Sequence, residues 1–573
     1  MARTGAQIVW DSLVREEVQV VFGYPGGAIL PTYDALLGSP IHHVLVRHEQ
    51  GATHMADGFA RAGGGVGVVL GTSGPGATNM VTGIATAMMD SSPIVCITGQ
   101  VPSTVIGYDA FQEIDITGIT IPITKHNYMV SKAEDIGPSI REAFHIARSG
   151  RPGPVLVDIT KDAQQANTDW HPDSTPERPL PQVDESSPVS PHDLEQIVKL
   201  IEGAQSPVIL AGRGILLSNA MAELLAFAEH LDVPVTTTLL GIGALPASHP
   251  LNLGMMGMHG ESWVNNAIQE ADLLIALGMR FDDRVTGNLK TYARNAKKIH
   301  VDIDASELNK NVPVDVGING DLRSVLKTIT PIVRSLNHDD WRAHIGKMRG
   351  KEAVLDIKHM ADTGHLYAAH VIHDIWRLTE GKAIVVTDVG QHQMWEAQYY
   401  HHDEPYSLIT SGGLGTMGFA LPAAIGAHFA RPDKEVWVIA GDGGIQMTQA
   451  ELTTIAQENI KINIAIINNG YLGMVRQWQE FFYGGRYSAT PLRSPDYVKL
   501  AEAHGLTGLR VATRPEVEGV VTTARENSGT VVIDFRVEQE DTVYPMVPSG
   551  ADLNEMIRRP QTSVLAETGA DVS

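Results

Sequence analysis

The chain of 573 residues is acidic, with a formal net charge of −23, and it is 43% hydrophobic and 19% charged. A chain of this length is too long to fold around one hydrophobic core, which predicts about three or four domains. The composition is that of an ordinary globular protein and argues against a disordered one. The negative charge disfavours nucleic acid and anionic membrane surfaces as partners, so a small anionic substrate requires local basic groups inside a pocket.

Cysteine usage and hydropathy point to a reducing compartment. Cys96 is the single cysteine, which excludes a disulfide within the chain, and its apolar surroundings predict a buried structural thiol. The N-terminus has no basic-then-apolar signal pattern, and no apolar run reaches the length of about 18 residues that a membrane span needs. We therefore expect a cytoplasmic protein without a membrane segment.

The first block, residues 1–168, alternates helix-like segments with short apolar strands, which is typical of a parallel sheet covered by helices. The predicted helices span 5–17 and 51–62, and the predicted strands span 18–22, 67–70, 94–98 and 155–158. Two glycine-rich turns, GYPGGA (23–28) and GTSGPG (71–76), follow strands, and plain turn chemistry explains them about as well as close approach to a cofactor. A proline-rich stretch at 169–191 predicts a linker.

The middle block (192–340) and the third block (366–547) repeat the α/β pattern. The predicted strands span 207–211, 233–237, 273–277 and 298–303 in the middle block, and 383–387, 435–440 and 462–467 in the third, with a helix at 448–458. A polar helical segment at 339–363 covers most of a second linker, 341–365. The polar tail, 548–573, is predicted to be mobile.

Two strand ends of the third block carry a pattern suited to a metal and a diphosphate. Gly441-Asp442-Gly443 follows one apolar strand, and Asn468-Asn469 follows the next. The carboxyl ends of parallel strands meet at one edge, where open α/β sheets bind ligands. Asp442 and Asn469 offer oxygens suited to Mg²⁺, and the glycines permit close approach of phosphates. Gly-Asp-Gly alone is a common tight turn, but with the asparagine pair it predicts a magnesium–diphosphate site like that of thiamine-diphosphate enzymes.

Glu49 opens a predicted helix directly after a strand, within RHEQGA (47–52). A lone glutamate there is usually a helix cap or dipole partner. A thiamine enzyme, however, needs a carboxyl group that protonates the pyrimidine ring and thereby turns the exocyclic amine into an internal base for the C2 proton. An apolar, water-poor pocket favours the protonated form of such a carboxyl. We therefore predict that Glu49 is the proton-transfer residue.

Taken together, these segments resemble the catalytic subunits of the acetolactate synthase (acetohydroxyacid synthase) family, from about residue 3 to 547. Three motifs are selective for that family: GMHG (257–260), RFDDRVTG (280–287) and MVRQWQ (474–479). The other matching segments are YPGGA (24–28), RHEQGA (47–52), GTSGPGATN (71–79), GQVP (99–102), DAFQE (109–113), SGRPGPVLVD (149–158), SGGLGTMGFALPAAIGA (411–427) and GDGG (441–444). The resemblance implies three doubly wound parallel-sheet domains, which bind the pyrimidine, FAD and the diphosphate in chain order.

For thiamine diphosphate and Mg²⁺, the resemblance implies a role for each matching residue. Glu49 hydrogen-bonds the aminopyrimidine, the Gly415 carbonyl takes its exocyclic amine, and Met417 lies under the bent cofactor. Gly27, Gln112 and Lys161 join Glu49 as catalytic-site positions. The remaining cofactor positions are Pro25, Gly26, Gln391, His392, Gly441, Gly443, Gly444 and Met474, and the implied metal ligands are Asp442, Asn469 and the backbone of Tyr471.

The resemblance also implies a structural FAD in the middle block. The acidic strand end VDID (301–304) suits a ribose hydroxyl, and GRG (212–214) after a strand suits a pyrophosphate, although Gly-x-Gly is usually only a tight turn. Arg213 replaces a residue that is often small. The implied positions are Arg151, Gly212, Arg213, Gly214, Thr238, Leu239, Met258, His259, Gly278, Arg280, Asp282, Arg284, Val285, Asp302, Ile303 and Asp321.

The family resemblance assigns substrate selection to Arg284 and Trp478. It places Phe111, Gln112, Lys161 and Met474 along the access channel. A fixed guanidinium suits the carboxylate of a 2-oxo acid in an acidic protein. Without a functional role, Trp478 would be an ordinary core residue and Lys161 would be an exposed surface residue.

The implied reaction decarboxylates pyruvate and ligates the remaining fragment to a second 2-oxo acid. Pyruvate as acceptor gives 2-acetolactate and 2-oxobutyrate gives 2-aceto-2-hydroxybutyrate, both for branched-chain amino-acid synthesis. Family members build the site between subunits, so a homodimer or tetramer and a separate regulatory small subunit are expected. The alternatives are an FAD-linked pyruvate oxidase, a catabolic acetolactate synthase without FAD, and a degenerate homologue that acts as a scaffold.

Overall fold

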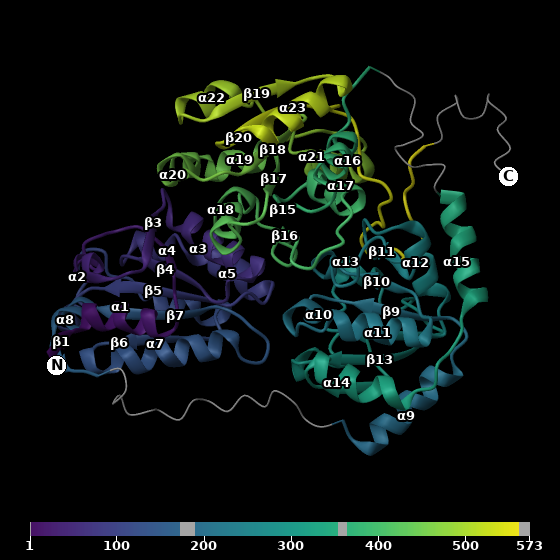
Figure 1. Cartoon of the computed structure of the whole chain (residues 1–573), viewed down its shortest axis with the longest axis horizontal. Helices are drawn as coiled ribbons and strands as arrows, with labels where there is room; N and C mark the ends of the chain where they lie inside the picture. The colour runs from purple at the N-terminus through teal and green to yellow at the C-terminus, as the bar shows by residue number, and fades with distance from the viewer. Residues whose placement is uncertain (1, 172–188, 353–363, 561–573) are drawn as a thin grey trace.

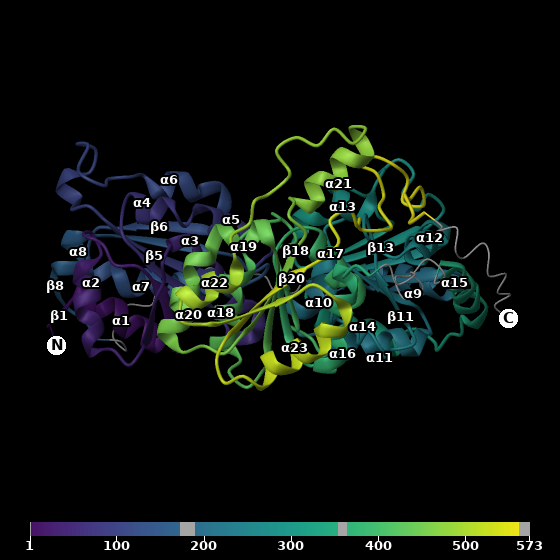
Figure 2. The same ribbon diagram turned by 90° about the horizontal axis from the view of Figure 1, so that it is seen from above.

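The computed structural model describes residues 2–171, 189–352 and 364–560, which form three α/β domains (Figure 1). Each domain holds one six-stranded sheet. Seen from above, elements of the third domain lie between those of the first and central domains (Figure 2). Parts of the two predicted linkers, 172–188 and 353–363, and residues 561–573 of the predicted tail lie outside the described residues.

The first sheet is parallel, in the order β3-β2-β4-β5-β7-β6. Its strands are β2 (Val20–Gly23), β3 (His42–Leu45), β4 (Gly67–Gly71), β5 (Ile94–Gln100), β6 (His126–Val130) and β7 (Val155–Thr160). Helices α1 (Gly5–Arg15) and α7 (Ala133–Arg148) pack on one face, and α3 (Glu49–Phe59) and α5 (Val81–Met89) pack on the other. Apolar runs predict the buried strands, whereas the partly exposed edge strand β6 is too polar to be recognised in this way.

The central sheet is also parallel, in the order β11-β10-β9-β12-β13-β14. Its strands are β9 (Pro207–Ala211), β10 (Val235–Thr237), β11 (Asn252–Met255), β12 (Leu273–Leu277), β13 (Lys297–Asp302) and β14 (Val316–Asn319). The main helices are α9 (Pro191–Gly203), α11 (Met221–Leu231), α12 (Ser262–Glu270), α14 (Leu322–Ile329) and α15 (Asp339–Glu352). This strand order reverses between β9 and β12, where doubly wound sheets open a crevice for ligands.

The third sheet has the order β16-β15-β17-β18-β20-β19 and is parallel throughout. Its strands are β15 (Ile384–Thr387), β16 (Leu408–Thr410), β17 (Val436–Gly441), β18 (Asn463–Asn468), β19 (Thr507–Val511) and β20 (Val531–Arg536). Its helices are α16 (Ala368–Thr379), α17 (Gln391–Tyr399), α18 (Ala420–Ala430), α19 (Asp442–Thr448), α20 (Leu452–Glu458), α21 (Gly473–Phe482), α22 (Tyr497–Ala503) and α23 (Arg514–Glu526). The predicted helix at 448–458 therefore begins too late, because the chain turns helical at Asp442 itself.

The first and third domains share one hydrophobic core, which is centred on α3 and α18. Small residues let the two helix backbones touch. A Cβ atom built on Gly58 would lie 2.0 Å from the Ala423 carbonyl oxygen, and one built on Gly426 would lie 1.8 Å from the Met55 carbonyl oxygen. No side chain fits at either glycine, so this packing fixes the two sheets relative to each other.

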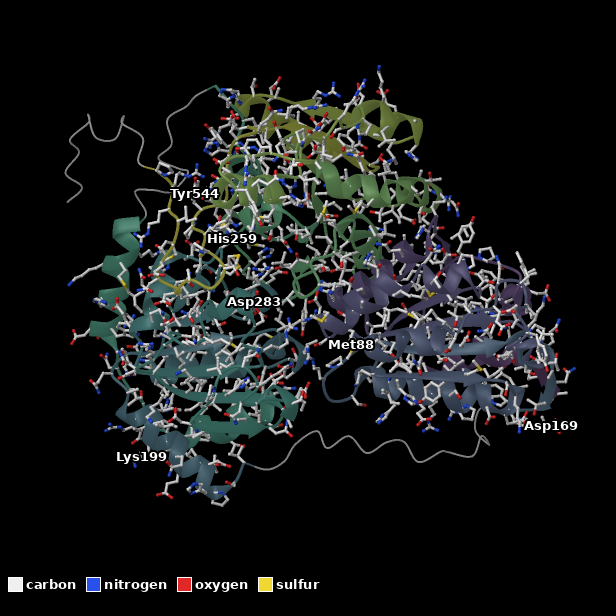
Figure 3. The ribbon with its side chains drawn as sticks, turned by 180° about the vertical axis from the view of Figure 1, so that it is seen from behind. Met88, Asp169, Lys199, His259, Asp283 and Tyr544 are labelled. Atoms are coloured by element: carbon white, nitrogen blue, oxygen red, sulfur yellow. The ribbon has the colours of Figure 1, made fainter. Side chains whose placement is uncertain are left out.

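The predicted mobile tail is wrong for its described part, residues 548–560. Leu553 is 1% exposed in the core of the central domain, and the amide of Asn288 donates a 3.0 Å hydrogen bond to the Ala551 carbonyl. Just before this segment, the Pro545 carbonyl lies 3.2 Å from His259 Nδ1, and Figure 3 shows Tyr544 and His259 close together. Within residues 2–171, 189–352 and 364–560, no helix combines the length and apolar character that a membrane crossing requires.

Candidate active site

Asp442 and Asn469 lie at the ends of the neighbouring parallel strands β17 and β18. Asp442 is buried, and its Oδ2 accepts a 2.8 Å hydrogen bond from Ser494 Oγ. Asn469 Oδ1 accepts one of 3.1 Å from the Tyr471 amide. Burial raises the pKa of Asp442 to about 6, and a bound divalent cation would reverse that shift. The donor chemistry, one carboxylate and one amide oxygen beside backbone carbonyls, fits Mg²⁺.

The described residues contain no group of three or more His, Cys, Asp or Glu side chains arranged to hold a metal. A cation at Asp442 would therefore take its other ligands from neutral protein oxygens and from the anionic oxygens of a phosphate. This pattern is usual for Mg²⁺, which binds through one or two carboxylates together with substrate or cofactor phosphates.

Gln391 and His392 open α17 beside this strand end. Gln391 Oε1 accepts a 3.2 Å hydrogen bond from Asn469 Nδ2, and His392 Nε2 accepts one of 3.2 Å from the Gly441 amide. A Cβ atom on Gly441 would lie 2.8 Å from the His392 ring, so glycine is needed for this approach. Burial lowers the pKa of His392 to about 3, which keeps the imidazole neutral at pH 7.

Asp388, directly after β15, anchors the segment that carries Gly415 and Met417. Its carboxylate accepts hydrogen bonds of 3.0 Å from the Gly418 amide and 3.3 Å from the Ala420 amide. Gly415 and Gly418 have φ angles of 67° and 87°, which glycine tolerates and which reverse the chain on both sides of Met417. A Cβ atom built on Gly443 would lie 3.5 Å from Met417 Cε, so Met417 lies next to the start of α19.

Glu49 begins α3 and faces the glycine-rich turn after β4. The residue is 8% exposed, and its Oε2 accepts a 2.9 Å hydrogen bond from Asn79 Nδ2. A Cβ atom on Gly76 would lie 3.2 Å from Glu49 Oε1. The glycine therefore leaves one carboxyl oxygen approachable while Asn79 holds the other.

The first turn of α3 is fixed by Glu451 of the third domain. The Glu451 carboxylate accepts hydrogen bonds from the amides of Arg47 and His48, both at 3.0 Å for Oε1. It also lies against Gly51, where a Cβ atom would be 2.5 Å from Glu451 Oε1. Glu451 therefore positions the backbone that carries Glu49.

A cavity of about 880 Å³ lies at the junction of the central and third domains, with one edge from the first domain. The positions predicted for FAD that line it are Arg151, Arg213, Gly214, Thr238, Leu239, Met258, His259, Gly278, Arg280, Asp282, Arg284, Val285, Asp302, Ile303 and Asp321. Gly415, Met417, Met474 and Trp478 line the same cavity, so the predicted flavin and thiamine regions are continuous. Gly212 lies behind the lining, because a Cβ atom there would be 2.1 Å from the Gly278 carbonyl oxygen.

Apart from Arg151, the site residues predicted in the first domain do not line this cavity within one chain. They are Pro25, Gly26, Gly27, Glu49, Phe111, Gln112 and Lys161. Phe111 is 88% exposed, and Gln112 lies against the turn at Gly74, whose Cβ atom would be 2.9 Å from Gln112 Cβ. Lys161 is half-buried at the start of α8 (Lys161–Gln165). One copy of the chain therefore presents two separate groups of predicted site residues.

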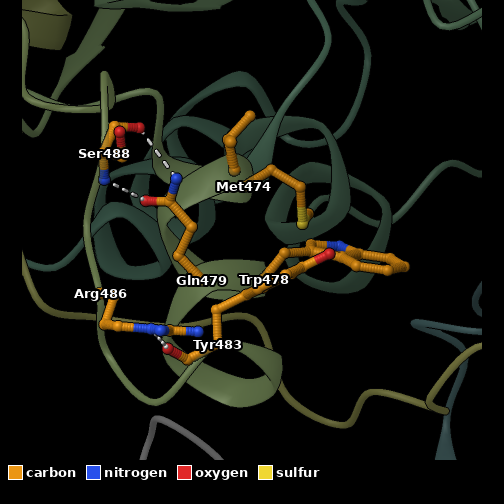
Figure 4. Close-up of a pocket in the computed structure, with 7 residues that line it drawn as sticks. Met474, Trp478, Gln479, Tyr483, Arg486 and Ser488 are labelled. Atoms are coloured by element: carbon orange, nitrogen blue, oxygen red, sulfur yellow. Dashed lines mark hydrogen bonds between the residues drawn. The ribbon is translucent and has the colours of Figure 1, made fainter.

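Trp478 lies on α21 between the large cavity and a second, open pocket of about 680 Å³ (Figure 4). Its ring lies 5.1 Å from that of Phe482, and Met474 precedes it by one helical turn. Gln479 holds the far wall through hydrogen bonds of 2.9 Å and 3.2 Å with the Ser488 backbone. Trp478 is half-buried and lines a pocket, so core packing, its plain alternative, does not describe it.

Comparison with known proteins gives consistent matches over nearly the whole chain. The N-terminal TPP-binding, central and C-terminal TPP-binding domains of thiamine pyrophosphate enzymes match residues 3–119, 194–329 and 388–535. The acetolactate synthase large subunit of Corynebacterium glutamicum is 49% identical over 565 residues, which cover 96% of this chain and 90% of that protein. The chain belongs to the acetolactate synthase large-subunit family.

Two further members of the acetolactate synthase family show how broadly the similarity extends. The isozyme 2 large subunit of Escherichia coli is 44% identical over 557 residues, which cover 97% of this chain and 99% of that protein. A probable acetolactate synthase large subunit of Methanococcus aeolicus is 45% identical over 569 residues, which cover 96% of this chain and 95% of that protein. The resemblance that the sequence motifs predict is thereby confirmed, as is an enzyme that depends on thiamine diphosphate.

Several residues that the family resemblance assigns to FAD already bind protein groups. Arg151 Nη1 lies 3.1 Å from Asp304 and 2.8 Å from Glu307, and so ties the first domain to the central one. Asp321 Oδ1 accepts a 2.9 Å hydrogen bond from the Ser324 amide as the N-cap of α14. The cavity volume and its glycine-bordered walls fit a dinucleotide. Asp302 lines the cavity, and burial raises the pKa of its carboxyl group to about 6.

Sequence reasoning misses four residues that contact the predicted site: Asn79, Asp388, Glu451 and Ser494. Asn79 ends the matching segment GTSGPGATN and Asp388 follows a predicted strand, so both carry a signal. Glu451 and Ser494 act through distant parts of the chain, and nothing local in the sequence marks them.

Proposed function

We propose that the protein is an acetolactate synthase catalytic subunit. It decarboxylates pyruvate and joins the remaining two-carbon unit to a second 2-oxo acid, which gives carbon dioxide and 2-acetolactate, or 2-aceto-2-hydroxybutyrate from 2-oxobutyrate, for valine, leucine and isoleucine synthesis. The observation that carries the proposal is the shared cavity, which Arg284 and Trp478 line together with Gly415 and Met417. The Arg284 side chain is 56% exposed, so its guanidinium is available to a substrate carboxylate.

When bound, thiamine diphosphate supplies the electron sink that lets pyruvate lose its carboxylate. Glu49 holds a proton against the pyrimidine ring, while Asn79 orients the carboxyl group. The Gly415 carbonyl would accept a hydrogen bond from the exocyclic amine, and Met417 would lie against the cofactor. The neutral His392, which accepts a hydrogen bond from the Gly441 amide, would border the diphosphate.

Two further cofactors are part of this proposal. Mg²⁺ is held by Asp442, Asn469 and the Tyr471 carbonyl, with Gln391, Gly443 and Gly444 beside the diphosphate; hard oxygen donors support this assignment. FAD occupies the central cavity without net redox, and the matching lining residues support it.

The site is completed by a second copy of the chain. The separation of Glu49, Phe111, Gln112 and Lys161 from the cavity supports this, since a partner's first domain could bring those residues opposite Met417 and Trp478. A homodimer is therefore the smallest active unit, and a tetramer of two such dimers is compatible with it. Relatives are called large subunits, which implies a separate regulatory small subunit. We place the assembly in the cytoplasm, and the domain limits at 1–168, 192–340 and 366–547.

The direct test is to incubate the purified protein with pyruvate, thiamine diphosphate and Mg²⁺, with and without FAD and 2-oxobutyrate. We expect acetolactate from pyruvate alone, the mixed product with 2-oxobutyrate, and an increase with FAD. Full activity of colourless protein without FAD would instead indicate a catabolic synthase. Rapid bleaching of bound flavin by pyruvate without oxygen would indicate a pyruvate oxidase, and no product at all would refute the proposal.

A further inference from the structure

A buried cluster of charged side chains lies where the three domains meet. Arg61, in the helical turn Ala60–Gly64 that follows α3, has a side chain that is 4% exposed, and its guanidinium donates to Asp57 Oδ1 at 2.6 Å and to Asp90 Oδ2 at 2.9 Å. It also lies over the Phe419 ring, 5.1 Å from the centroid. Both carboxylates are fully buried, so each depends on the arginine for neutralisation.

On one side, the cluster grips the segment that leads to Gly415 and Met417. Arg61 Nη1 donates a 2.6 Å hydrogen bond to the Thr410 carbonyl at the end of β16. Asp90 accepts hydrogen bonds from the amides of Gly412 (3.1 Å) and Gly413 (2.7 Å). Charged groups of the first domain thus set the course of residues 410–413, immediately before the thiamine positions.

On the other side, the cluster reaches the central cavity through Ser92 and Arg213. Arg213 Nη2 donates a 3.1 Å hydrogen bond to Ser92 Oγ, and Ser92 lies two residues after Asp90 in the same turn. Despite burial, the Arg61 charge, helped by hydrogen bonds from Arg61 and Ser92, lowers the pKa of Asp57. Met88 marks the first-domain edge of this seam in Figure 3. A cavity-lining residue of the central domain is thereby linked to the cluster by one serine.

Arg213 is incompletely satisfied in the described structure. Its Nη1 atom is buried and hydrogen-bonds none of the described groups, although the side chain lines the cavity. Burial and the neighbouring Arg61 lower the pKa of Arg213 to about 10, so it remains charged at pH 7. A buried donor without an acceptor is unfavourable, and an anionic group in the cavity would supply one.

We infer that Arg213 and Ser92 couple occupancy of the central cavity by an anionic dinucleotide to the binding of thiamine diphosphate. An anion on Arg213 fixes its guanidinium on Ser92, which steadies the Asp57–Arg61–Asp90 cluster and hence the segment 410–415. The inference rests on the proposed function, because it takes the central cavity as the flavin site. It gives a flavin without redox chemistry a definite task, which is to order the thiamine site.

The test compares two adjacent serines at the same seam, Ser91 and Ser92. Ser91 Oγ accepts a 2.9 Å hydrogen bond from Arg151 Nε, whereas Ser92 Oγ accepts one of 3.1 Å from Arg213 Nη2, so Ser91→Ala is the matched control for Ser92→Ala. The dissociation constant of thiamine diphosphate with Mg²⁺ is measured by tryptophan fluorescence quenching, with and without saturating FAD. The ratio of the two constants reports the coupling.

We expect FAD to tighten thiamine diphosphate binding at least about fivefold in the wild-type protein and in Ser91→Ala. In Ser92→Ala this ratio falls toward one, and Arg213→Met, checked for native circular dichroism, gives the same loss. A wild-type ratio of one, or an unchanged ratio in Ser92→Ala, would overturn the inference even if acetolactate forms normally. Absence of both acetolactate and thiamine binding in the wild-type protein would instead refute the proposed function.

Discussion

The sheets of the first and third domains have the same strand order, yet the proposed function assigns opposite halves of the chemistry to the two domains. Numbered in chain order within each domain, the strands of both sheets run 2-1-3-4-6-5, whereas those of the central sheet run 3-2-1-4-5-6. Helix α3 of the first domain also packs against α18 of the third domain in a common core. Because the topology is the same, it cannot determine which end of the cofactor each domain binds.

The two domains differ in the residues that come directly after equivalent strands. After the second strand, the first domain places Glu49, and the third places the glycine-rich segment with Gly415. After the third strand, the third domain continues into Asp442, and the first domain continues into neutral Thr72. Each sheet therefore supplies a group that the other lacks, and the comparison teaches that loop residues, not the sheet, divide the work.

Removal of the charge at the third-domain strand end should have the largest effect. Asp442→Asn removes the only carboxylate of the predicted Mg²⁺ site, so we expect loss of cofactor binding and a fall in activity of at least about 10³-fold. Asp433→Asn, an exposed partner of Arg431 in the same domain, is the control. Near-normal Mg²⁺-dependent thiamine binding by Asp442→Asn would break the proposed division of roles.

The corresponding change in the first domain should spare binding and remove proton transfer. We expect Glu49→Gln to lower kcat by about 10²–10³-fold while the protein still binds thiamine diphosphate and Mg²⁺. Glu458→Gln, which alters a partly exposed pair with His42, serves as the control. Unchanged acetolactate formation by Glu49→Gln would remove Glu49 from the mechanism.

A smaller effect is expected from the group that orients Glu49. Asn79→Ala removes the 2.9 Å hydrogen bond to Glu49 Oε2, and a hydrogen bond worth about 1–1.5 kcal/mol corresponds to about a tenfold change in rate. We expect kcat to fall by about that factor with KM for pyruvate unchanged. Thr78→Ala removes a hydroxyl that donates to the nearby Pro75 carbonyl and should leave kcat unaltered. A change in KM alone would mean that Asn79 binds substrate instead.

Much of this arrangement is predictable from local sequence. Apolar runs predict the buried strands, and residues at their ends, such as Asp442 and Asn469, predict the metal-binding edge. The polar edge strands β6, β11 and β14 escape such a prediction because only part of each is buried. Contacts such as Glu451 with the Arg47 amide join residues 404 positions apart, and no local pattern encodes them.

The last prediction concerns stability, not rate, at the seam between the first and third domains. Burial lowers the pKa of His54, which lies 5.3 Å from the Phe419 ring, to about 4. Below pH 6.5 the unfolded chain binds the proton first, so stability decreases as the pH falls, until the folded pKa is reached. Relative to His54→Gln, we expect the wild-type free energy of unfolding to fall by up to about 1.4 kcal/mol per pH unit from 6.5 to 4 in urea titrations. Equal pH slopes would contradict a buried neutral His54, and His192→Gln on the surface of α9 is the control.

Mixing two inactive variants tests most directly whether the two equivalent domains complete one site across two copies. Glu49→Gln and Asp442→Asn proteins are unfolded together, refolded and assayed for acetolactate. In a mixed dimer, one site takes Glu49 from the Asp442→Asn chain and Asp442 from the Glu49→Gln chain, so that site is intact. Random pairing makes about half of the dimers mixed, with one intact site of two, and therefore restores about a quarter of wild-type activity. If each chain forms its own site, every chain carries a defect, and the mixture stays as inactive as the separate variants.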